Sequence, residues 1–396
     1  MNFSRRNFIS TSLAGFASLG INSRVKAIRN LHNTNTGTIY RTLGKTGIRL
    51  PIVSMGVMNA DLPALLEASY KTGIRHFDTA WYYQRGKNES MVGEVIDKMG
   101  VRKEVIIGTK IYLGRDRHSI PIPERAKLIE ERFSESLERL KTNYVDILYY
   151  HNAKQVSEIN FPELKDLFLR LKKEGKEKHV GVSTHANQTE IINEVIKQGY
   201  FDVVLVAFNY ILGKDKELVR TLKKASKKGI GLIAMKTQAG SSLWERISNE
   251  KVAGEINHTA MLKWALNNDF ITTAVPGYTT FKHMEEDFSV ASNLEYSKEE
   301  SEFLNDIDLD KKLAYCLQCG KCISTCPKNA DVPDLMRISM YLNQYHNYFH
   351  AYNVYKDIDE KHGLAVCKTC DICTAKCSHY VPIAENIELL KQMNFC

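Results

Sequence analysis

The most restrictive feature of this sequence is a regular alternation of short β-rich runs with longer amphipathic runs over residues 52–277. Eight runs have the length and the Val, Ile and aromatic content of strands, and helical runs separate them. The strand candidates are Ile52–Gly56, Ile74–Ala80, Glu104–Ile111, Val145–Asn152, His179–His185, Asp202–Tyr210, Gly231–Thr237 and Ile271–Gly277. The helix candidates are Asp61–Gly73, Pro123–Thr142, Phe161–Lys176, Thr189–Gly199, Lys214–Gly229 and His258–Asn268.

Eight strands that alternate with helices over about 250 residues predict a closed (β/α)8 barrel, the TIM barrel of the α/β class. An open doubly wound sheet is the competing arrangement. It is disfavoured because no G-x-G-x-x-G turn follows the first strand. We therefore expect a barrel domain at residues 38–296, preceded by a small hairpin over Thr38–Pro51 with Gly44 and Gly47 as turn residues.

In such barrels the reactive side chains lie at the carboxyl ends of the strands. Reading only these positions gives Asp78, Lys110, His151, Ser183, Asn209, Lys236 and the pair Pro276–Gly277. Each of them also has a structural explanation, because an aspartate can cap a helix and a buried histidine can be a hydrogen-bonded core residue. The set therefore indicates a catalytic site only if several of its members serve one reaction.

The cysteines indicate a second module at the C-terminus. All nine lie in the last 81 residues, and eight of them form two copies of the spacing C-x2-C-x2-C-x3-C. The first copy is Cys316, Cys319, Cys322 and Cys326, the second is Cys367, Cys370, Cys373 and Cys377, and Cys396 fits neither. This spacing is typical of four-iron clusters. Zinc and disulfides are the alternatives, but zinc sites favour pairs of C-x2-C and triplets this tight pair poorly as disulfides.

The double motif resembles the two-cluster ferredoxins, so we expect a small, mainly helical iron–sulfur module at residues 310–396. The resemblance implies two 4Fe–4S clusters that exchange their fourth ligands. One cluster would bind Cys316, Cys319, Cys322 and Cys377, and the other would bind Cys367, Cys370, Cys373 and Cys326. Between the motifs, tyrosines at spacings of four and three predict one helix face, which packs against the barrel or carries electrons: Tyr341, Tyr345, Tyr348, Tyr352 and Tyr355.

The N-terminal segment, residues 1–27, has the order of an export signal. A short basic region with Arg5 and Arg6 precedes a weakly apolar stretch that is too short and too polar to span a membrane. The paired arginines resemble the twin-arginine signal, which implies a periplasmic protein exported in the folded state; a basic, disordered N-terminus is the alternative. Four of the 54 basic residues and none of the 46 acidic residues lie here. The rest of the chain is nearly balanced, so no nucleic-acid partner is expected.

Several strand ends resemble the aldo-keto reductase family. The segments that carry the resemblance are residues 77–83 (FDTAWYY), 88–93 (NESMVG), 107–110 (IGTK), 146–151 (DILYYH), 181–185 (GVSTH) and 275–277 (VPG). The resemblance implies that Tyr83 is a general acid, that Lys110 and Asp78 tune it, and that His151 orients the carbonyl. The chemistry needs these types, because a phenol has a pKa near 10 and a neighbouring ammonium favours its ionised form.

The resemblance also implies a nicotinamide site built from Ser183, Thr184, Met235, Gly277 and Glu286. Only part of the family pattern is present. Thr184 stands where asparagine is usual, Met235 stands where an aromatic residue often stacks on the nicotinamide, and the basic residues used for the 2′-phosphate are replaced after Gly277. These departures count against an NADPH preference, and NAD(P) stays a candidate cofactor.

Together these features predict an oxidoreductase that interconverts a carbonyl and an alcohol, with Tyr83 as general acid/base and two 4Fe–4S clusters as electron relay. Its partners would be a small carbonyl or alcohol substrate and a redox partner protein. The alternative is a non-catalytic barrel that serves as an iron–sulfur electron carrier. The periplasm lacks a free nicotinamide pool, so export requires cofactors loaded beforehand or clusters in place of nicotinamide.

Overall fold

Eight parallel strands, each beside its neighbour in sequence, form one sheet whose two edges meet. The computed structural model describes residues 37–114, 119–238, 256–314 and 316–393, so the expected signal at residues 1–27 and Cys396 lie outside the described residues. The strands are β3 (Met55–Gly56), β4 (His76–Asp78), β5 (Ile106–Ile111), β6 (Val145–Tyr150), β7 (Glu177–Thr184), β8 (Val203–Ala207), β9 (Gly231–Met235) and β10 (Thr273–Ala274). Ser54 donates to the Ala274 carbonyl at 2.8 Å and Gly56 to the Pro276 carbonyl at 2.9 Å, which joins the first strand to the last. The predicted barrel is confirmed.

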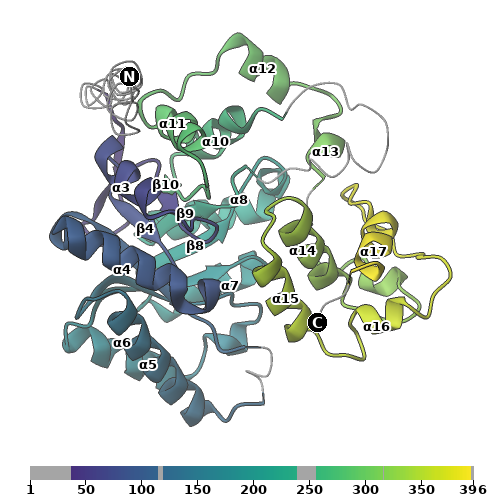
Figure 1. Cartoon of the computed structure of the whole chain (residues 1–396), viewed down its shortest axis with the longest axis horizontal. Coiled ribbons are helices and arrows are strands. Elements are labelled where there is room, and N and C mark those ends of the chain that lie inside the picture. The colour runs from purple at the N-terminus through teal and green to yellow at the C-terminus, as the bar shows by residue number, and fades with distance from the viewer. Residues whose placement is uncertain (1–36, 115–118, 239–255, 315, 394–396) are drawn as a thin grey trace, which may run out of the picture.

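Helices connect successive strands and form the outer layer of the barrel (Figure 1). They are α3 (Pro63–Thr72), α4 (Lys87–Met99), α5 (Ile122–Arg139), α6 (Pro162–Lys173), α7 (Gln188–Gln198), α8 (Lys216–Lys227), α10 (His258–Leu266) and α11 (Phe281–Ser289). The first and last strands are shorter than expected, because only two residues of each form regular ladder pairs.

The expected hairpin is present and closes the amino-terminal end of the barrel. Strands β1 (Tyr40–Thr42) and β2 (Arg49–Pro51) are antiparallel. Their turn brings the backbone so close to the barrel that a Cβ on Gly44 would lie 2.3 Å from the Gly229 carbonyl. Leu43 and Leu50, both fully buried, pack there with inward-facing residues of the strands.

A tyrosine fills the barrel interior at mid-height. Tyr149 on β6 is fully buried between two glycines of the adjacent strands. A Cβ on Gly181 would lie 2.5 Å from its ring and one on Gly108 would lie 3.2 Å away. The ring therefore needs a glycine at position 181 and leaves little room for a side chain at position 108, and it forms a floor beneath the carboxyl ends of the strands.

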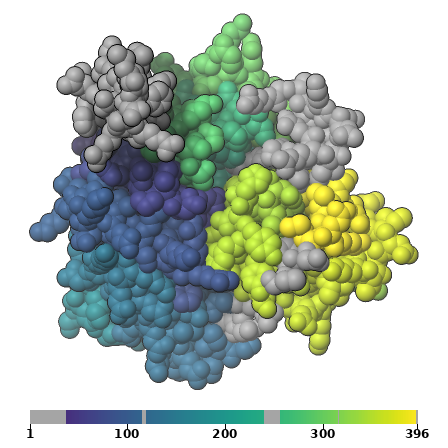
Figure 2. All heavy atoms as spheres, viewed as in Figure 1, coloured from purple at the N-terminus to yellow at the C-terminus, as the bar shows by residue number. Residues whose placement is uncertain are grey.

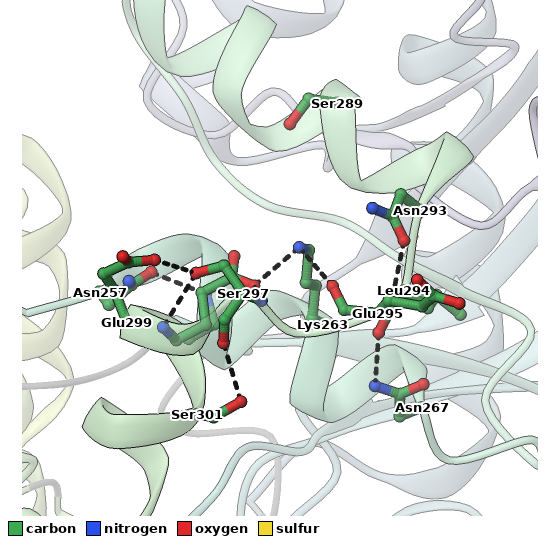
Figure 3. Close-up of polar contacts among 12 residues, drawn as sticks. Asn257, Lys263, Asn267, Ser289, Asn293, Leu294, Glu295, Ser297, Glu299 and Ser301 are labelled. Atoms are coloured by element: carbon green, nitrogen blue, oxygen red, sulfur yellow. Dashed lines mark hydrogen bonds and ion pairs between the residues drawn. The ribbon is translucent and has the colours of Figure 1, made fainter.

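The segment after the barrel is anchored to α10 by polar contacts (Figure 3). Lys263 donates to the Glu295 carbonyl and to the Glu300 carboxylate, both at 2.8 Å, and Asn267 donates to the Leu294 carbonyl at 3.1 Å. Ser297 and Glu300 form a capping box that starts α12 (Lys298–Leu304). The path from the barrel to α13 (Leu309–Lys312) and the cysteine module is therefore fixed at its beginning.

The cysteine module is mainly helical, as expected. Its longer helices are α14 (Val332–Asn343), α15 (Tyr348–Asp357) and α17 (Ile383–Lys391), with a short α16 (Leu364–Cys367). Figure 1 shows these helices on one side of the barrel, with α14 and α15 nearest to it. In the space-filling view the atoms of α14 and α15 lie directly against the barrel (Figure 2). Among the described residues, the structure contains no helix with the length and hydropathy needed to cross a bilayer.

The prediction of one tyrosine-lined helix is wrong. The chain breaks between α14 and α15, where His346 has a φ of 49° and Asn347 caps the second helix by accepting from the His350 amide. Tyr341 and Tyr345 face the barrel at Lys236, whereas Tyr348 stacks on Tyr352 at a centroid distance of 6.3 Å. The tyrosines keep their spacing of four and three residues although they lie on two helices. The reason is that the second helix begins after its cap with almost the same rotational phase as the first.

Candidate active site

The loop after β4 positions Tyr83. Gln84 and Arg85 have φ angles of 50° and 56°, and Gly86 has a φ of 84°, so the backbone turns sharply before α4 begins. At the start of α4, Asn88 accepts a hydrogen bond from the Thr79 hydroxyl at 2.7 Å and donates to the Val57 carbonyl at 2.7 Å. Asn88 therefore ties the loop to both β3 and β4.

Asp78 and Lys110 form a buried ion pair at the carboxyl ends of β4 and β5. The Lys110 Nζ lies 2.5 Å from Asp78 Oδ1 and 2.5 Å from the Thr79 carbonyl oxygen. Lys110 is 1% exposed and Asp78 is 4% exposed. Burial raises the pKa of Asp78 and lowers the pKa of Lys110, while the charge of each partner opposes the effect on the other. Neither charge can be lost alone without a large cost.

Tyr83 lies over this pair. The Lys110 Nζ is 5.0 Å from the centroid of the Tyr83 ring. The expectation of a phenol with a lowered pKa is wrong for this structure: burial, reinforced by Tyr82 and Asp78, raises the pKa of Tyr83 well above its ordinary value. Burial thus outweighs the positive charge of Lys110, whose hydrogen bonds go to Asp78 and to the Thr79 carbonyl.

His151 faces Tyr83 from the end of β6. The two ring centroids are 5.9 Å apart and the rings are nearly perpendicular, at 79°. Burial, together with the charges of Lys110 and Arg337, lowers the pKa of His151 well below its ordinary value, so the imidazole is neutral at pH 7. The structure therefore brings together all four residues that the sequence suggested for catalysis, and their roles stay predictions.

These residues open onto a cavity of about 710 Å³ at the carboxyl ends of the strands. Asp78, Tyr83 and His151 line it together with three of the five residues suggested for nicotinamide: Met235, Gly277 and Glu286. A volume of this size suits a ligand, since ligand sites commonly span about 300–1,000 Å³.

The other two nicotinamide candidates have their hydroxyls turned into the protein. Ser183 Oγ accepts from the Asn152 amide at 2.9 Å, and Thr184 Oγ1 donates to the carbonyls of Ala153 and Ala186, both at 2.8 Å. Both are buried and neither lines the cavity. Their contact with a nicotinamide carboxamide stays a prediction.

Residues of the cysteine module also belong to the cavity region, and the sequence did not suggest a role in the site for Arg337 or His350. Arg337 and Tyr341 on α14 line the cavity, and the ring of His350 on α15 lies 5.2 Å from that of Tyr83. His350 is fully buried, and neither of its ring nitrogens has a hydrogen-bond partner among the described residues. Only the docking of the module reveals Arg337 and His350 as part of the site, because nothing local in the sequence places them beside a barrel strand.

Polar contacts hold the module over the barrel mouth. They are Lys154 to Asp334 at 2.8 Å, Tyr112 to Asp357 at 2.7 Å, Lys236 to Tyr345 at 3.1 Å and Asn347 to Asn59 at 2.8 Å. Each joins a side chain of a barrel loop or strand end to one in or beside α14 or α15. The module therefore forms one wall of the cavity.

The cysteine thiols gather in two groups that cross between the motifs. Burial raises the pKa of Cys316 to about 12, with contributions from Cys322 and Cys377. Burial likewise raises the pKa of Cys367 to about 11, with contributions from Cys326, Cys373 and Cys370. The fourth cysteine of each motif therefore lies near the first three of the other, which is the grouping that the ferredoxin resemblance implied.

This donor set fits iron–sulfur clusters. The eight cysteines that the structure describes are all free thiols, so the disulfide alternative is not observed among them. Across the described ranges, no three His, Cys, Asp or Glu side chains converge on a position for a single metal ion. The ligands of a cluster bind different irons, so they lie farther apart than the ligands of a single ion. Buried thiols with a raised pKa need a bound metal centre to be deprotonated.

Comparisons with known families agree with this division. A family model described as the aldo/keto reductase family matches residues 54–260, and one described as a 4Fe-4S dicluster domain matches residues 315–382. The chain is 26% identical over 306 residues to L-galactose dehydrogenase of Arabidopsis thaliana, covering 68% of this chain and 92% of that protein. It is 25% identical over 292 residues to the uncharacterized oxidoreductase YqkF of Bacillus subtilis (strain 168), covering 66% and 93%.

Solved structures of similar fold include the aldo-keto reductase AKR11C1 from Bacillus halodurans in its holo form. The TM-score is 0.54 at 19% identity, covering 67% of this chain and 95% of that one. The thermostable aldo-keto reductase Tm1743 gives a TM-score of 0.53 at 24% identity, covering 67% and 98%. At this identity the likeness concerns the fold. With a family model over half of the sequence, a matching barrel and a dicluster domain after it, this chain belongs to the aldo/keto reductase family and is an oxidoreductase.

Proposed function

We propose that this oxidoreductase interconverts a carbonyl and an alcohol on a small substrate, with Tyr83 as the general acid/base. The observation that carries the proposal is the stack of Tyr83 over the buried Asp78–Lys110 pair, opposite His151, at the wall of a cavity of about 710 Å³. An ion pair this deeply buried, directly under a cavity-lining phenol, is costly for a structural role alone.

The chain's own groups account for the proton chemistry. Reduction of a carbonyl adds two electrons and two protons, one proton to carbon as part of a hydride equivalent and one to oxygen. Burial keeps Tyr83 protonated at neutral pH, so its hydroxyl can donate to the oxygen as charge develops there. The neutral His151 can orient the carbonyl through a hydrogen bond, and the Lys110 charge below the ring opposes the cost of the tyrosinate that is formed.

The residues present are compatible with a nicotinamide and with clusters. Met235, Gly277 and Glu286 line the cavity and would hold NAD(P), which supplies a hydride when bound. The two thiol groups would hold two 4Fe–4S clusters, which supply single electrons and connect the site to a redox partner protein. We further propose that residues 1–27 direct the folded protein to the periplasm through the twin-arginine route.

The experiment compares two neighbouring tyrosines in anaerobically purified protein. Tyr83→Phe should lower turnover of a panel of small aldehydes and ketones about 10²–10⁴-fold, with NADPH or reduced methyl viologen as electron donor. Tyr82→Phe is the matched control, since Tyr82 also lines the cavity and lies beside His151, whereas the Lys110 ammonium lies under the ring of Tyr83. Iron content and melting temperature should be unchanged in both variants, because each loses one hydroxyl.

A second candidate function is that of an electron carrier with an inactive barrel. The inward-facing hydroxyls of Ser183 and Thr184 favour it, since they leave the nicotinamide site incomplete. In that case Tyr83→Phe would leave electron flow to an acceptor unchanged, while Cys319→Ser or Cys370→Ser would abolish it. Wild-type carbonyl reduction by Tyr83→Phe would remove Tyr83 from its proposed role.

A further inference from the structure

Two basic side chains from different parts of the chain meet at the cavity. Lys236 follows β9, where the backbone adopts a φ of 59°, and Arg337 comes from α14 of the cysteine module. Both line the cavity together with Tyr83 and His151. Arg337 is only 9% exposed, so its charge is largely removed from bulk water.

Among the described residues, one carboxylate forms an ion pair with these two cations. Asp334 is the acid nearest to Arg337, at 3.9 Å, but it also pairs with Lys154 at 2.8 Å and so serves two bases. Lys236 donates to the Tyr345 hydroxyl at 3.1 Å, and within the described ranges no ion pair joins it to an acid. Its ammonium lies 4.2 Å from the Tyr345 ring centroid, a contact that stabilises a cation without neutralising it.

The acids that line the cavity are already engaged. Asp78 is bound by Lys110, and Glu286 pairs with Lys282 at 3.5 Å. Asp287 accepts from Gln238, and burial raises its pKa to about 7, so it is partly protonated at neutral pH. The excess positive charge therefore stays at the wall formed by Lys236 and Arg337.

The neighbouring titratable groups respond to this excess. Burial is the main cause of the low pKa values of His151, His185 and His350, and the charge of Arg337 lowers all three further. Burial and Arg337 together lower the pKa of Lys236 to about 7. Repulsion of this kind, in a cavity large enough for a ligand, is relieved when an anion binds.

We propose that the substrate of this site is a carbonyl compound, or the corresponding alcohol, that carries a carboxylate, with Arg337 and Lys236 holding the carboxylate while Tyr83 and His151 face the carbonyl. The inference rests on the proposed function and names its substrate class. The guanidinium offers the paired donors that match a carboxylate, and Lys236 adds a second charge. The iron–sulfur module thus supplies a specificity residue to the barrel.

The reaction on such a substrate balances without change at the carboxylate. An oxo acid would take a hydride at the carbonyl carbon from NAD(P)H, which leaves as NAD(P)⁺, and one proton from Tyr83 at the oxygen, and Tyr83 would then recover its proton from solvent. The product is the hydroxy acid, still anionic. The two cations therefore bind substrate and product alike and act on binding rather than on the chemical step.

The first test uses the holoprotein with para-carboxybenzaldehyde and its uncharged methyl ester. Wild type should prefer the acid, mostly through a lower KM. Arg337→Gln should lower kcat/KM for the acid about 10²-fold and leave that for the ester within about threefold, and Arg337→Lys should restore part of the loss. Arg170→Gln, which removes an exposed arginine from its pair with Glu130, is the control and should change neither value.

A second test needs no turnover. Calorimetry on the anaerobic holoprotein should show that benzoate binds and the neutral benzamide does not, and that Arg337→Gln abolishes the difference. Benzoate affinity should fall as the pH rises through about 7, where Lys236 loses its proton and Asp287 on the cavity wall becomes charged, and Lys236→Met combined with Asp287→Asn should remove this pH dependence. The groups that face Lys236 are Tyr341, Tyr345, Arg337, His350 and His185, and the histidines are already neutral in this range.

The outcomes separate this inference from the proposed function. Equal affinity for benzoate and benzamide, or equal loss of acid and ester turnover in Arg337→Gln, overturns the carboxylate site even if carbonyls are reduced. Selective benzoate binding with no turnover of any carbonyl supports the carboxylate site and contradicts the proposed function. If Arg337→Gln weakens NADP⁺ but not benzoate, the cations bind cofactor phosphates and the inference fails.

Discussion

The buried pair beneath Tyr83 allows a quantitative test of how the barrel tolerates charge at its centre. In Asp78→Asn, the Lys110 ammonium loses its counter-ion at 1% exposure while its hydrogen bond to the Thr79 carbonyl remains. Removal of one partner from a buried pair costs about 3–5 kcal/mol of unfolding free energy. In the double variant with Lys110→Met no charge is left. Its main loss is the donor to the Thr79 carbonyl, about 1 kcal/mol, so it should be more stable than Asp78→Asn.

The assay is guanidinium unfolding under anaerobic conditions, followed by the fluorescence of the barrel tryptophans, including Trp81 and Trp264. Lys71→Met is a matched control, because Lys71 and Glu67 have the same 2.5 Å separation but are exposed on α3. Loss of such a surface pair should cost less than about 1 kcal/mol. The reasoning is refuted if Asp78→Asn is as mild as this control, or if the cost of the double variant equals the sum of the single costs.

Three further predictions concern the clusters, a buried carboxylate and export. Anaerobically purified protein should contain about eight irons per chain, Cys377→Ser should lower this to about four, and Cys396→Ser should leave it unchanged; zinc in place of iron would contradict the cluster assignment. Burial raises the pKa of Glu177 to about 8, so its folded-state penalty is absent below its unfolded value and complete above pH 8. Glu177→Gln should therefore stabilise the protein by on the order of 2 kcal/mol more at pH 8 than at pH 5, measured by thermal unfolding, and an equal gain at both values would show that the carboxylate is solvated. Replacement of Arg5 and Arg6 together by Lys should retain the protein in the cytoplasm on fractionation, whereas undiminished periplasmic delivery would indicate another export route.

The barrel could be predicted because its signals are local. Strand candidates alternate with helices at short range, and Asp78, Lys110 and His151 each stand at the end of one strand, so the fold brings them to one edge. The first and last strands were overestimated, since apolar composition continues past the last regular ladder pair. The strand-end positions were sufficient to place these three residues together, and the family resemblance added Tyr83 to them.

The remaining parts of the site depend on contacts that a linear pattern does not contain. Arg337 and His350 reach the cavity only because α14 and α15 dock on the barrel mouth, and the sequence does not encode that orientation in any short motif. The direction of the Tyr83 pKa shift was also missed, because it depends on burial, and the module contributes to that burial. Asn347 was a readable signal, since asparagine is a strong helix cap.

The exchange of fourth ligands between the two cysteine motifs has a consequence for the stability of the protein towards oxygen. Under the proposed ligand sets, each cluster is a cross-link between the two ends of the segment from Cys326 to Cys367, and this segment carries Arg337 and His350. The two clusters would thus hold the ends of this segment together. These cross-links lower the entropy that the chain loses on folding, which the small core of the module could not otherwise offset. Oxidative loss of one cluster would free cysteines at both ends of the segment at once, because each cluster takes ligands from both motifs. Exposure to oxygen would then loosen the wall of the cavity that the module forms, while Tyr83 would stay in place on the barrel.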